Sequence, residues 1–232
     1  MKALFTFIAC LFAQLAFAQA ETIEKSYAYT GQKLDLDLNF GTEVILKSWD
    51  KNEISVKITY EINEGKDNEV MDWKVDDSNG KLTVEIELDS KKLEKLGDCC
   101  CNSKNGNYWS GRGSKGNRVC ADIKVEVMMP GKSDVKIKTI VADVAVEGFS
   151  GNLDLETVTG EINLLWAKGA GAEVNIETVN GGIYTNMDLD MEKEKGLPKI
   201  SSHKVKATYK SGGKALKLKT VTSDIYLKAS DL

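Results

Sequence analysis

Four of the five cysteines lie in one segment, residues 97–120. The segment is rich in Gly, Asn and Ser and contains Cys99, Cys100, Cys101 and Cys120. A bridge from Cys120 to one of the three consecutive cysteines would close a loop of about twenty residues and stabilise the fold by about 3 kcal/mol. Four cysteines allow three pairings, and adjacent cysteines bridge only with strain, so free or intermolecular thiols are the alternative. We expect a disulfide-stapled loop, without a choice of pairing.

The same loop has two further interpretations, a metal site and a ligand contact. A Cys₄ zinc site usually shows pairs of cysteines two to four residues apart, whereas three consecutive cysteines point in divergent directions. No metal ion or other cofactor is therefore predicted. Tyr108, Trp109 and Arg112 lie inside the loop. An aromatic pair beside a cation is typical of contact with a sugar ring or of a protein interface. We predict these three residues as ligand contacts, pre-ordered by the disulfide.

The groups that could support catalysis are several carboxylates and the one histidine. Glycoside hydrolysis needs two carboxyl groups about 5–10 Å apart across a cleft. The carboxylates in question lie on outward strand positions or near corners: Asp154, Glu156, Glu177, Glu161 and Asp224. Outward charges on alternating strands are normally a solvated face, and here Lys217 and Lys219 would oppose them. His203 has no second histidine to form a metal site or a triad, and no catalytic motif is present. We predict no enzyme and place His203 on the surface.

The first twenty residues have the pattern of a signal peptide. Lys2 is followed by a largely apolar stretch at 3–18, and A-x-A cleavage sites end at Ala18 and Ala20. The apolar stretch is too short for a confident membrane span, and the rest of the chain has no transmembrane candidate. We therefore expect an exported protein, in the periplasm, on the cell surface or outside the cell.

The overall charge argues against one class of partner. The 232-residue chain carries 31 basic and 35 acidic residues, a formal net charge of −4. A weakly acidic protein lacks the electrostatic footprint of a nucleic-acid binder. The 20 glycines and 2 prolines favour many tight, regular turns.

Strands must position these residues, because apolar and polar residues alternate along most of the chain. The clearest stretches are 34–38, 54–62, 82–88 and 123–127. One face of each such strand requires a core and the other requires water. Helical patterns are short and weak, at 90–96 and 187–195. Trp49, Trp73 and Trp166 fall in or beside strands and are expected to pack there.

The second half of the chain is repetitive. Segments 135–146, 153–164, 174–185 and 216–227 align, and their shared threonines Thr139, Thr157, Thr178 and Thr220 are 18, 21 and 42 residues apart. The last interval is twice 21, which suggests a degenerate repeat at 205–213 and an insertion at 188–202. A period near twenty with two short strands and a small corner residue is typical of a β-solenoid coil.

Stacked coils predict which repeat residues lie above one another. Each coil would lie on the last, about 4.8 Å away. We expect one buried ladder of Val158, Val179 and Val221, and a second of Ile162, Ile183 and Ile225. Gly160, Gly181 and Ser223 would occupy the corner, where a larger side chain is awkward or a positive φ is needed.

The order of these features resembles the putative-adhesin family of exported bacterial β-strand-repeat domains. The matching stretches are 40–44, 48–56, the step at 125–130 and the corners at 141–144, 158–162 and 221–225. The resemblance extends over about 30–232 and implies a parallel β-solenoid at the cell envelope. It supplies no functional residues, because function resides in sites rather than folds. The cysteine-bearing loop departs from the family pattern.

Together these observations predict an all-β protein, a single-stranded parallel β-helix or β-solenoid with an N-terminal β-strand cap region. We divide it into a signal peptide (1–20), an N-terminal β-strand region with the Cys-rich loop 97–120 (21–120), and solenoid repeats (121–232). The predicted function is a non-enzymatic, adhesin-like binding module of the cell envelope that recognises a glycan or an envelope protein. The alternatives are a periplasmic structural or accessory protein and, as a minor one, a polysaccharide-cleaving β-helix enzyme.

Overall fold

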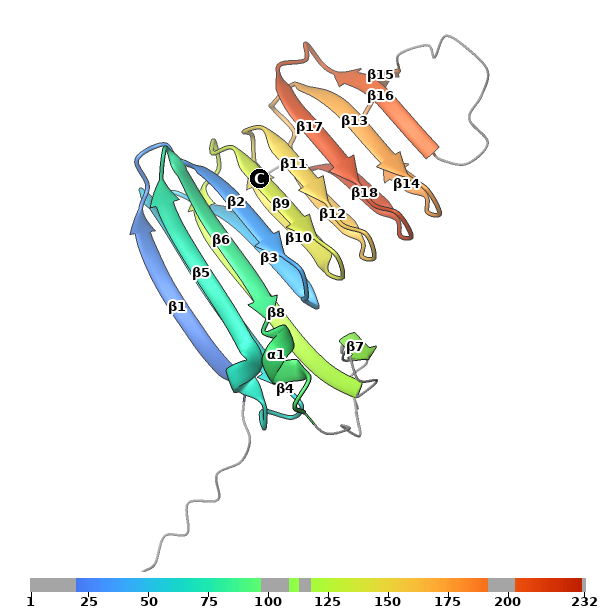
Figure 1. The fold of residues 1–232 in the computed structure, drawn as a ribbon. Coiled ribbons are helices and arrows are strands. Elements are labelled where there is room, and N and C mark those ends of the chain that lie inside the picture. Colours follow the sequence, from blue (N-terminus) through green and yellow to red (C-terminus); the bar gives the residue numbers. More distant parts are fainter. Residues whose placement is uncertain (1–19, 97–108, 113–117, 192–202, 231–232) are drawn as a thin grey trace, which may run out of the picture.

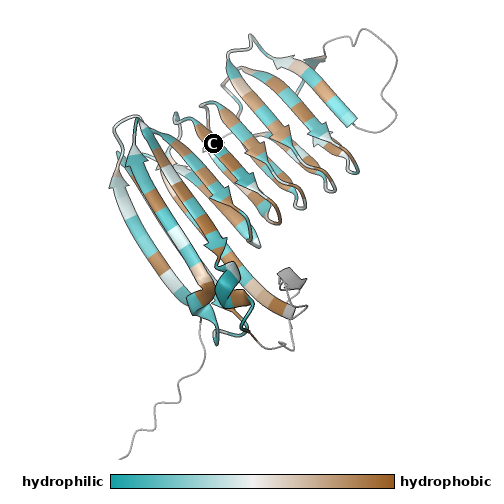
Figure 2. Ribbon diagram, in the orientation of Figure 1, coloured by the Kyte–Doolittle hydropathy of each residue, from teal (hydrophilic) through white to brown (hydrophobic). Residues whose placement is uncertain are grey.

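The structure is a computed structural model that describes residues 20–96, 109–112, 118–191 and 203–230. The predicted all-β class is confirmed, since the chain forms two mixed β-sheets that face each other (Figure 1). Apolar and polar residues alternate along the strands (Figure 2), so that apolar side chains fill the space between the sheets. The buried core runs from Leu34 in the N-terminal part to Leu227 near the C-terminus.

Sheet A contains a path of eight strands. Their order is β1 (Glu21–Ala28), β4 (Glu53–Ile62), β8 (Arg118–Pro130), β3 (Glu43–Trp49), β10 (Asp143–Phe149), β12 (Ile162–Ala167), β18 (Ile225–Ser230) and β14 (Ile183–Thr185). A further strand, β7 (Trp109–Arg112), pairs with β8 outside this path. From β3 to β14 neighbouring strands are parallel, whereas β4 pairs antiparallel with both β1 and β8.

Sheet B has nine strands. Their order is β15 (Leu189–Met191), β16 (His203–Tyr209), β13 (Ala172–Thr178), β17 (Lys214–Lys219), β11 (Leu153–Glu156), β9 (Val135–Thr139), β2 (Lys33–Leu38), β6 (Lys81–Leu88) and β5 (Met71–Ser78). Two short helices, η1 (Asn68–Val70) and α1 (Ser90–Leu93), lie beside the N-terminal strands. Asp89 caps α1 by accepting hydrogen bonds from the N–H groups of Lys91 and Lys92. The helix is shorter than the predicted span of 90–96.

One connection recurs along the two sheets. A strand of sheet B leads through a tight corner into a strand of sheet A, and successive units lie parallel. The units in the described part of the chain are β2–β3, β9–β10, β11–β12, β17–β18 and β13–β14. The first of these, β2–β3, lies in the N-terminal region, for which the sequence predicts strands of alternating apolar and polar residues but no repeat unit. Its corner is one residue longer, because Leu38 pairs with Thr139 and Glu43 with Asp143.

The units do not stack in chain order. Leu216 of β17 pairs with Leu153 of β11 on one side and with Val174 of β13 on the other. The last unit of the sequence therefore lies between two earlier ones, and the expectation that each coil lies on the last is wrong at this point. The predicted degenerate repeat at 205–213 is also not a further unit, because β16 pairs antiparallel with β13.

Charge on the outer face of sheet B accounts for this order. The residues opposite one another in one row are Asp37, Lys138, Glu156, Lys219, Glu177 and Lys204. Acids and bases alternate from Asp37 to Lys204, and the Lys219 Nζ lies 2.8 Å from the Glu156 carboxylate. Beyond Asp37 the row continues with a like charge, Glu85 of β6. In chain order Glu156 would face Glu177, and like charges directly opposite are destabilising. Insertion of β17 separates these two carboxylates.

Burial at the corners reverses one prediction and confirms another. Val158 and Val179 are 42% and 37% exposed, so the predicted buried valine ladder is wrong. The preceding threonines are buried in its place: Thr139, Thr157, Thr178 and Thr220. The isoleucine ladder is confirmed as stacked, with Ile225 paired to both Ile162 and Ile183. Ile162 and Ile225 are buried as predicted, whereas Ile183 is half-buried.

Each buried threonine of the inner units is hydrogen-bonded to the corner of the neighbouring unit. The Thr157, Thr220 and Thr178 hydroxyls donate to the carbonyls of Ala142, Gly160 and Ser223. A Cβ on Gly181 would lie 1.9 Å from the Ser223 carbonyl oxygen, and one on Gly160 would lie 2.0 Å from that of Ala142. The corner glycines are therefore required by close approach between units, as the sequence predicted for these positions.

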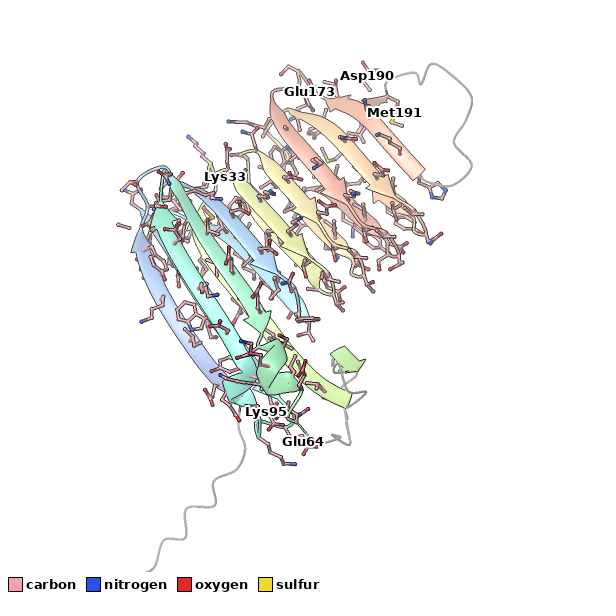
Figure 3. The ribbon with its side chains drawn as sticks, viewed as in Figure 1. Lys33, Glu64, Lys95, Glu173, Asp190 and Met191 are labelled. Atoms are coloured by element: carbon pink, nitrogen blue, oxygen red, sulfur yellow. The ribbon has the colours of Figure 1, made fainter. Side chains whose placement is uncertain are left out.

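Sheet B extends beyond sheet A at one end. The strands β16 and β15 continue sheet B past β13, whereas sheet A ends at β14 in the described part of the chain. Met191, labelled with Asp190 and Glu173 in Figure 3, is 54% exposed on β15. The helical pattern predicted at 187–195 is thus wrong at 189–191, which form a strand. Trp166 is fully buried, and Trp49 and Trp73 are half-buried, which confirms that they pack against the fold.

Candidate binding surface on the outer face of sheet A

The outer face of sheet A carries exposed and half-buried apolar side chains in adjacent strands. We define the apolar strip as Met128 of β8, Ile45 of β3, Ala145 of β10, Leu165 of β12, Tyr226 of β18 and Tyr184 of β14. Pairing places Ile45 opposite Ala145, and Tyr226 opposite Tyr184. Met128 is 38% exposed and Tyr184 is 51% exposed. The strip crosses six neighbouring strands that are far apart in the sequence.

A shallow hollow of about 270 Å³ lies in the middle of the strip. Ile45, Ala145 and Leu165 line it, together with Asn163. The small Ala145 side chain leaves room between its larger neighbours. Lys47 and Glu147 stand at the rim and form a long ion pair of 3.9 Å. The hollow can receive an apolar group, with one cation and one anion beside it.

The strip ends in a stacked pair of tyrosines. The ring centroids of Tyr184 and Tyr226 are 4.9 Å apart and the rings are inclined by 14°. A Cβ on Gly182 would lie 2.6 Å from the Tyr184 ring, so the glycine leaves the space that the phenol occupies. Lys228 Nζ lies 5.3 Å from the Tyr226 ring centroid. Such aromatic pairs stabilise a sheet, and their rings also present apolar surface to a ligand.

An acidic row runs beside the apolar strip. We define it as Glu43, Asp143, Glu161 and Asp224, which lie next to one another on β3, on β10 and at the starts of β12 and β18. Glu43 forms an ion pair of 3.0 Å with Lys124. Within the described residues, the other three carboxylates form no ion pair. Two of them instead accept hydrogen bonds from uncharged backbone donors: Asp143 accepts from the Glu161 N–H, and Asp224 accepts from the Gly182 N–H.

The acidic row lies next to the phenol of Tyr226 and contributes to its pKa. The pKa of Tyr226 is raised, first by desolvation and then by the negative charges of Asp224 and Glu161. The Tyr226 hydroxyl also lies 3.4 Å from the Asp224 carboxylate. The aromatic end of the strip is therefore an electronegative environment.

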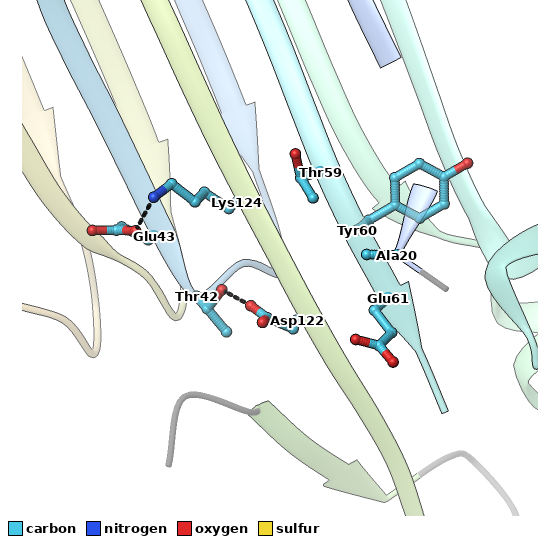
Figure 4. A pocket seen from close by; sticks show the side chains of 8 residues that line it. All are labelled: Ala20, Thr42, Glu43, Thr59, Tyr60, Glu61, Asp122 and Lys124. Carbon is cyan, nitrogen blue, oxygen red and sulfur yellow. Dashed lines mark hydrogen bonds and ion pairs between the residues drawn. The ribbon is translucent and has the colours of Figure 1, made fainter. Parts of the chain in front are cut away.

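The row begins at the hollow shown in Figure 4. This hollow, of about 230 Å³, is lined by Glu43, Lys124, Asp122 and Glu61, among others. Glu61 and Asp122 are directly opposite each other on β4 and β8, a like-charge pair that costs stability. The Thr42 hydroxyl donates to Asp122, and Lys124 bonded to Glu43 has a raised pKa. Lys124 is thus the cation that faces this end of the row.

The predicted ligand-contact residues fall only partly within the described residues. Trp109 and Arg112 are the first and last residues of β7, and Tyr108 lies outside the described residues. Pairing of Trp109 with Ala121 brings the β7 backbone to the strand position next to Asp122. The structure therefore brings β7 to the end of sheet A where the acidic row begins, and a contact role for these side chains stays a prediction.

The predicted disulfide also stays a prediction. Cys99, Cys100 and Cys101 lie outside the described residues. Cys120 is 3% exposed on β8, and its backbone N–H donates to the Asn63 side chain. This position holds Cys120 firmly at the start of a central strand.

The carboxylates weighed for catalysis divide between the two sheets. Asp154, Glu156 and Glu177 lie on the outer face of sheet B and pair with Lys217, Lys219 and Lys204 at 3.1, 2.8 and 3.7 Å. They form the solvated, charge-paired face that the sequence predicts. Glu161 and Asp224 belong to the acidic row. His203 is exposed at the start of β16, as predicted, and the described residues contain no metal-binding group of three or more His, Cys, Asp or Glu side chains.

Sequence reasoning missed the apolar strip, although the repeats contain its signal. Aligned by their corners, the repeats share an outward position one residue after the first buried residue of the second strand. That position holds Ile45, Ala145, Asn163, Tyr226 and Tyr184. Four of these five aligned residues are apolar or aromatic, whereas residues that face water on a strand are normally polar.

Comparisons with known proteins give no family assignment. No family model matches the sequence, and no curated protein matches it. A solved structure of a "putative cell adhesion protein" from Clostridium sporogenes is 16% identical, covers 91% of this chain and 100% of its own, and superposes with a TM-score of 0.49. Structures of putative adhesins from Bacteroides fragilis and Parabacteroides merdae are 11% and 10% identical, with TM-scores of 0.25. They cover 90% and 91% of this chain and 97% and 96% of their own.

The names of these proteins agree with the resemblance inferred from the sequence. The helices of the described residues include none that is long and apolar enough to span a membrane.

Proposed function

We propose that this chain is a non-enzymatic binding module of the cell envelope and that the outer face of sheet A is its binding surface. The observation that carries the proposal is the difference between the two outer faces. On sheet B, Asp154, Glu156 and Glu177 are each paired with a lysine of a neighbouring strand. On sheet A, the exposed side chains of Met128 and Tyr184 and the half-buried apolar side chains between them lie beside Asp143, Glu161 and Asp224, which form no ion pair within the described residues. The described ion pairs of this face hold Glu43, Glu126 and Glu147. Contiguous exposed apolar surface in an otherwise charged protein is typical of an interaction site.

We further propose that the recurring units form a β-solenoid, with β1, β4, β5 and β6 as its N-terminal cap. The parallel registers between five successive units support this description. The repetition is what generates a flat face, because equivalent outward positions of neighbouring units fall into straight rows. A signal peptide at 1–20 would deliver this module to the periplasm or the cell surface.

The Cys-rich loop is proposed as a second contact region at the same end of sheet A. A disulfide from Cys120 would fix the loop against β8, and Tyr108, Trp109 and Arg112 would extend the surface beyond the acidic row. The pairing of β7 with β8 supports this placement. The chemistry is that of adhesion to a glycan or to an envelope protein.

A binding assay with matched variants tests the proposal. Purified mature chain is titrated onto envelopes isolated from the producing cells, and bound protein is measured as a function of concentration. We expect saturable binding that Leu165→Asn weakens about tenfold, since it places an amide in the apolar strip. Thr83→Asn makes a polar change on the outer face of sheet B and should leave binding unchanged. Equal effects of the two variants, or no saturable binding, would refute a binding role for sheet A.

Protease treatment of intact cells separates surface adhesion from a periplasmic accessory role. With a C-terminal tag and a periplasmic control protein, loss of the tag from intact cells indicates exposure at the surface. Trp109→Ala then tests glycan or matrix capture by the loop. Protection until the envelope is broken would end the surface-adhesin proposal and favour a periplasmic structural or accessory role.

A further inference from the structure

We infer that the sheet A surface binds an extended, positively charged protein segment, with its apolar side chains on the apolar strip and its lysines or arginines along the acidic row. This inference rests on the proposed function and identifies the chemistry of the partner. The hollow and the tyrosine pair of the apolar strip present apolar surface that apolar side chains of a partner can cover. The acidic row then selects the charge of the partner.

The charge argument comes from comparison of the two faces within one molecule. Both sheets stack outward side chains at the same strand spacing of about 4.8 Å. Sheet B alternates Glu156, Lys219 and Glu177, which removes repulsion between neighbours. Sheet A instead aligns Asp143, Glu161 and Asp224 with no described ionic partner. An uncompensated row costs stability that alternation would recover, so a ligand that supplies cations is the complementary partner.

The geometry also favours a segment lying on the face over a strand added to the sheet edge. At the tyrosine end of the strip, the edge strand β14 has three residues, and short edge strands disfavour strand addition. Next to this short strand, the Asn186 side chain accepts the Ala229 N–H and so occupies the part of β18 that β14 leaves uncovered. The opposite edge strand, β1, is separated from the strip by β4. The face retains the open hollow at Ala145 and the exposed Tyr184 ring.

A protein segment fits the strip better than a glycan. The floor of the hollow is aliphatic, formed by Ile45, Ala145 and Leu165. Aliphatic side chains match valine, leucine or tyrosine side chains, whereas sugar rings are held mainly by aromatic stacking and polar contacts. The Tyr226 hydroxyl lies 3.4 Å from the Asp224 carboxylate, so this end of the strip also carries negative charge. A basic segment can satisfy both features together.

Two labelled peptides test the inference by fluorescence anisotropy. One alternates lysine with valine and tyrosine, and the other carries glutamate in place of each lysine. We expect the lysine peptide to bind the mature chain, with an affinity that falls as salt rises, and the glutamate peptide not to bind. Binding of both peptides alike, or of neither, would overturn the inference. So would displacement of the lysine peptide by a neutral β-glucan oligosaccharide, which would point to a glycan.

Variants of the acidic row make the test specific. The combination Asp143→Asn, Glu161→Gln and Asp224→Asn removes three charges and keeps an oxygen atom that can accept from the Glu161 N–H, the Asn163 amide and the Gly182 N–H. Only the second acceptor of Asp224, next to the Tyr226 hydroxyl, is lost. We expect peptide affinity to fall at least about tenfold and its salt dependence to decrease, while the thermal midpoint stays equal or rises. The control Glu177→Gln, on sheet B, should leave peptide affinity unchanged. Unchanged affinity in the triple variant would refute the role of the row.

The outcome also distinguishes this inference from the proposed function. If the lysine peptide does not bind while envelope binding still depends on Leu165, the sheet A surface is a binding site for another class of partner. If both fail, the proposed function itself is wrong. Circular dichroism of each variant confirms that it is folded.

Discussion

At the scale of single residues, the corner threonines form the most regular polar contacts of the core. Three of them donate a hydrogen bond to a corner carbonyl of the next unit. Thr139 is equally buried, but its hydroxyl has no hydrogen-bond partner among the described residues. Its neighbour is the longer corner of β2–β3. The same residue type thus has two energetic roles, decided by the neighbouring unit.

Substitution of these threonines by valine measures the difference. Thr220→Val removes the hydroxyl that donates to the Gly160 carbonyl and should lower the free energy of unfolding by about 1 kcal/mol. Thr139→Val removes a buried hydroxyl without a partner and should be neutral or stabilising. Urea titration monitored by circular dichroism gives both values. Equal losses in the two variants would contradict a role for the inter-unit hydrogen bond.

The corner glycines provide a second prediction at this scale. A Cβ at Gly181 would lie 1.9 Å from the Ser223 carbonyl oxygen, so Gly181→Ala must push two units apart. We expect a loss of about 2–3 kcal/mol of unfolding free energy. Gly169→Ala is the matched control, since no atom lies within 4 Å of its Cβ position. Similar stability of the two variants would show that the corner relaxes without cost.

At the scale of elements, the order of the units follows from complementary charge rather than from chain order. The strand β17 carries Lys217 and Lys219, and both its neighbours carry acids. The apolar face of the strand would fit any position in the stack, because all units bury similar aliphatic residues. The polar face is what differs between units. Charge is therefore the feature that separates alternative orders of the units.

An exchange of charges tests this explanation. In an isolated ion pair, the exchange Glu156→Lys with Lys219→Glu would restore the attraction. In the row of sheet B it places the new lysine beside Lys138 and the new glutamate beside Glu177. We therefore expect the double variant to remain about 1 kcal/mol less stable than the parent at low salt, and the gap to narrow at high salt. Lys219→Glu alone should also destabilise.

The control for this experiment is Lys132→Glu, which makes the same charge change at an exposed turn residue. It should alter the free energy of unfolding by less than about 0.5 kcal/mol. Recovery of the parent stability in the double variant would show that only the Glu156–Lys219 pair matters and would remove the explanation for the order of the units.

At the scale of the whole molecule, one contact links the outermost strand of sheet A to the dependence of stability on pH. The Tyr60 hydroxyl of β4 donates to the Glu21 carboxylate of β1 at 2.7 Å. This bond lowers the pKa of Glu21. Burial, followed by the same bond, raises the pKa of Tyr60 to about 12. The ionised carboxylate and the neutral phenol are the states that the fold stabilises.

The lowered pKa of Glu21 and the raised pKa of Tyr60 predict an acid and an alkaline limit to the pH range in which the fold is stable. The Glu21 contribution is present above its unfolded pKa and is lost as pH falls through the lowered folded value. The Tyr60 contribution is present below its unfolded pKa near 10 and is lost as pH rises towards 12. We expect Tyr60→Phe to reduce stability at neutral pH. We also expect stability to fall less steeply towards acid and towards alkaline pH in this variant. Thermal unfolding of the mature chain between acid and alkaline pH measures this, and an unchanged pH profile would contradict it.

The sequence by itself determined the all-β class, the faces of the strands and the small residues at the corners. These features are local, because side chains alternate with a period of two and a corner glycine follows from the immediate approach of the next unit. It also predicted the paired charges of Asp154 and Glu156 with Lys217 and Lys219.

Only the tertiary structure decided the order of the units and the surface that follows from it. The position of β17 between β11 and β13 depends on lateral contacts between strands about sixty residues apart, which alternation does not encode. The exposed valines and buried threonines at the corners depend on where the chain turns between the sheets. The apolar strip, from Met128 to Tyr184, exists because strand pairing aligns side chains that are separate in the sequence. Lateral packing and charge complementarity are long-range, and they placed the candidate site.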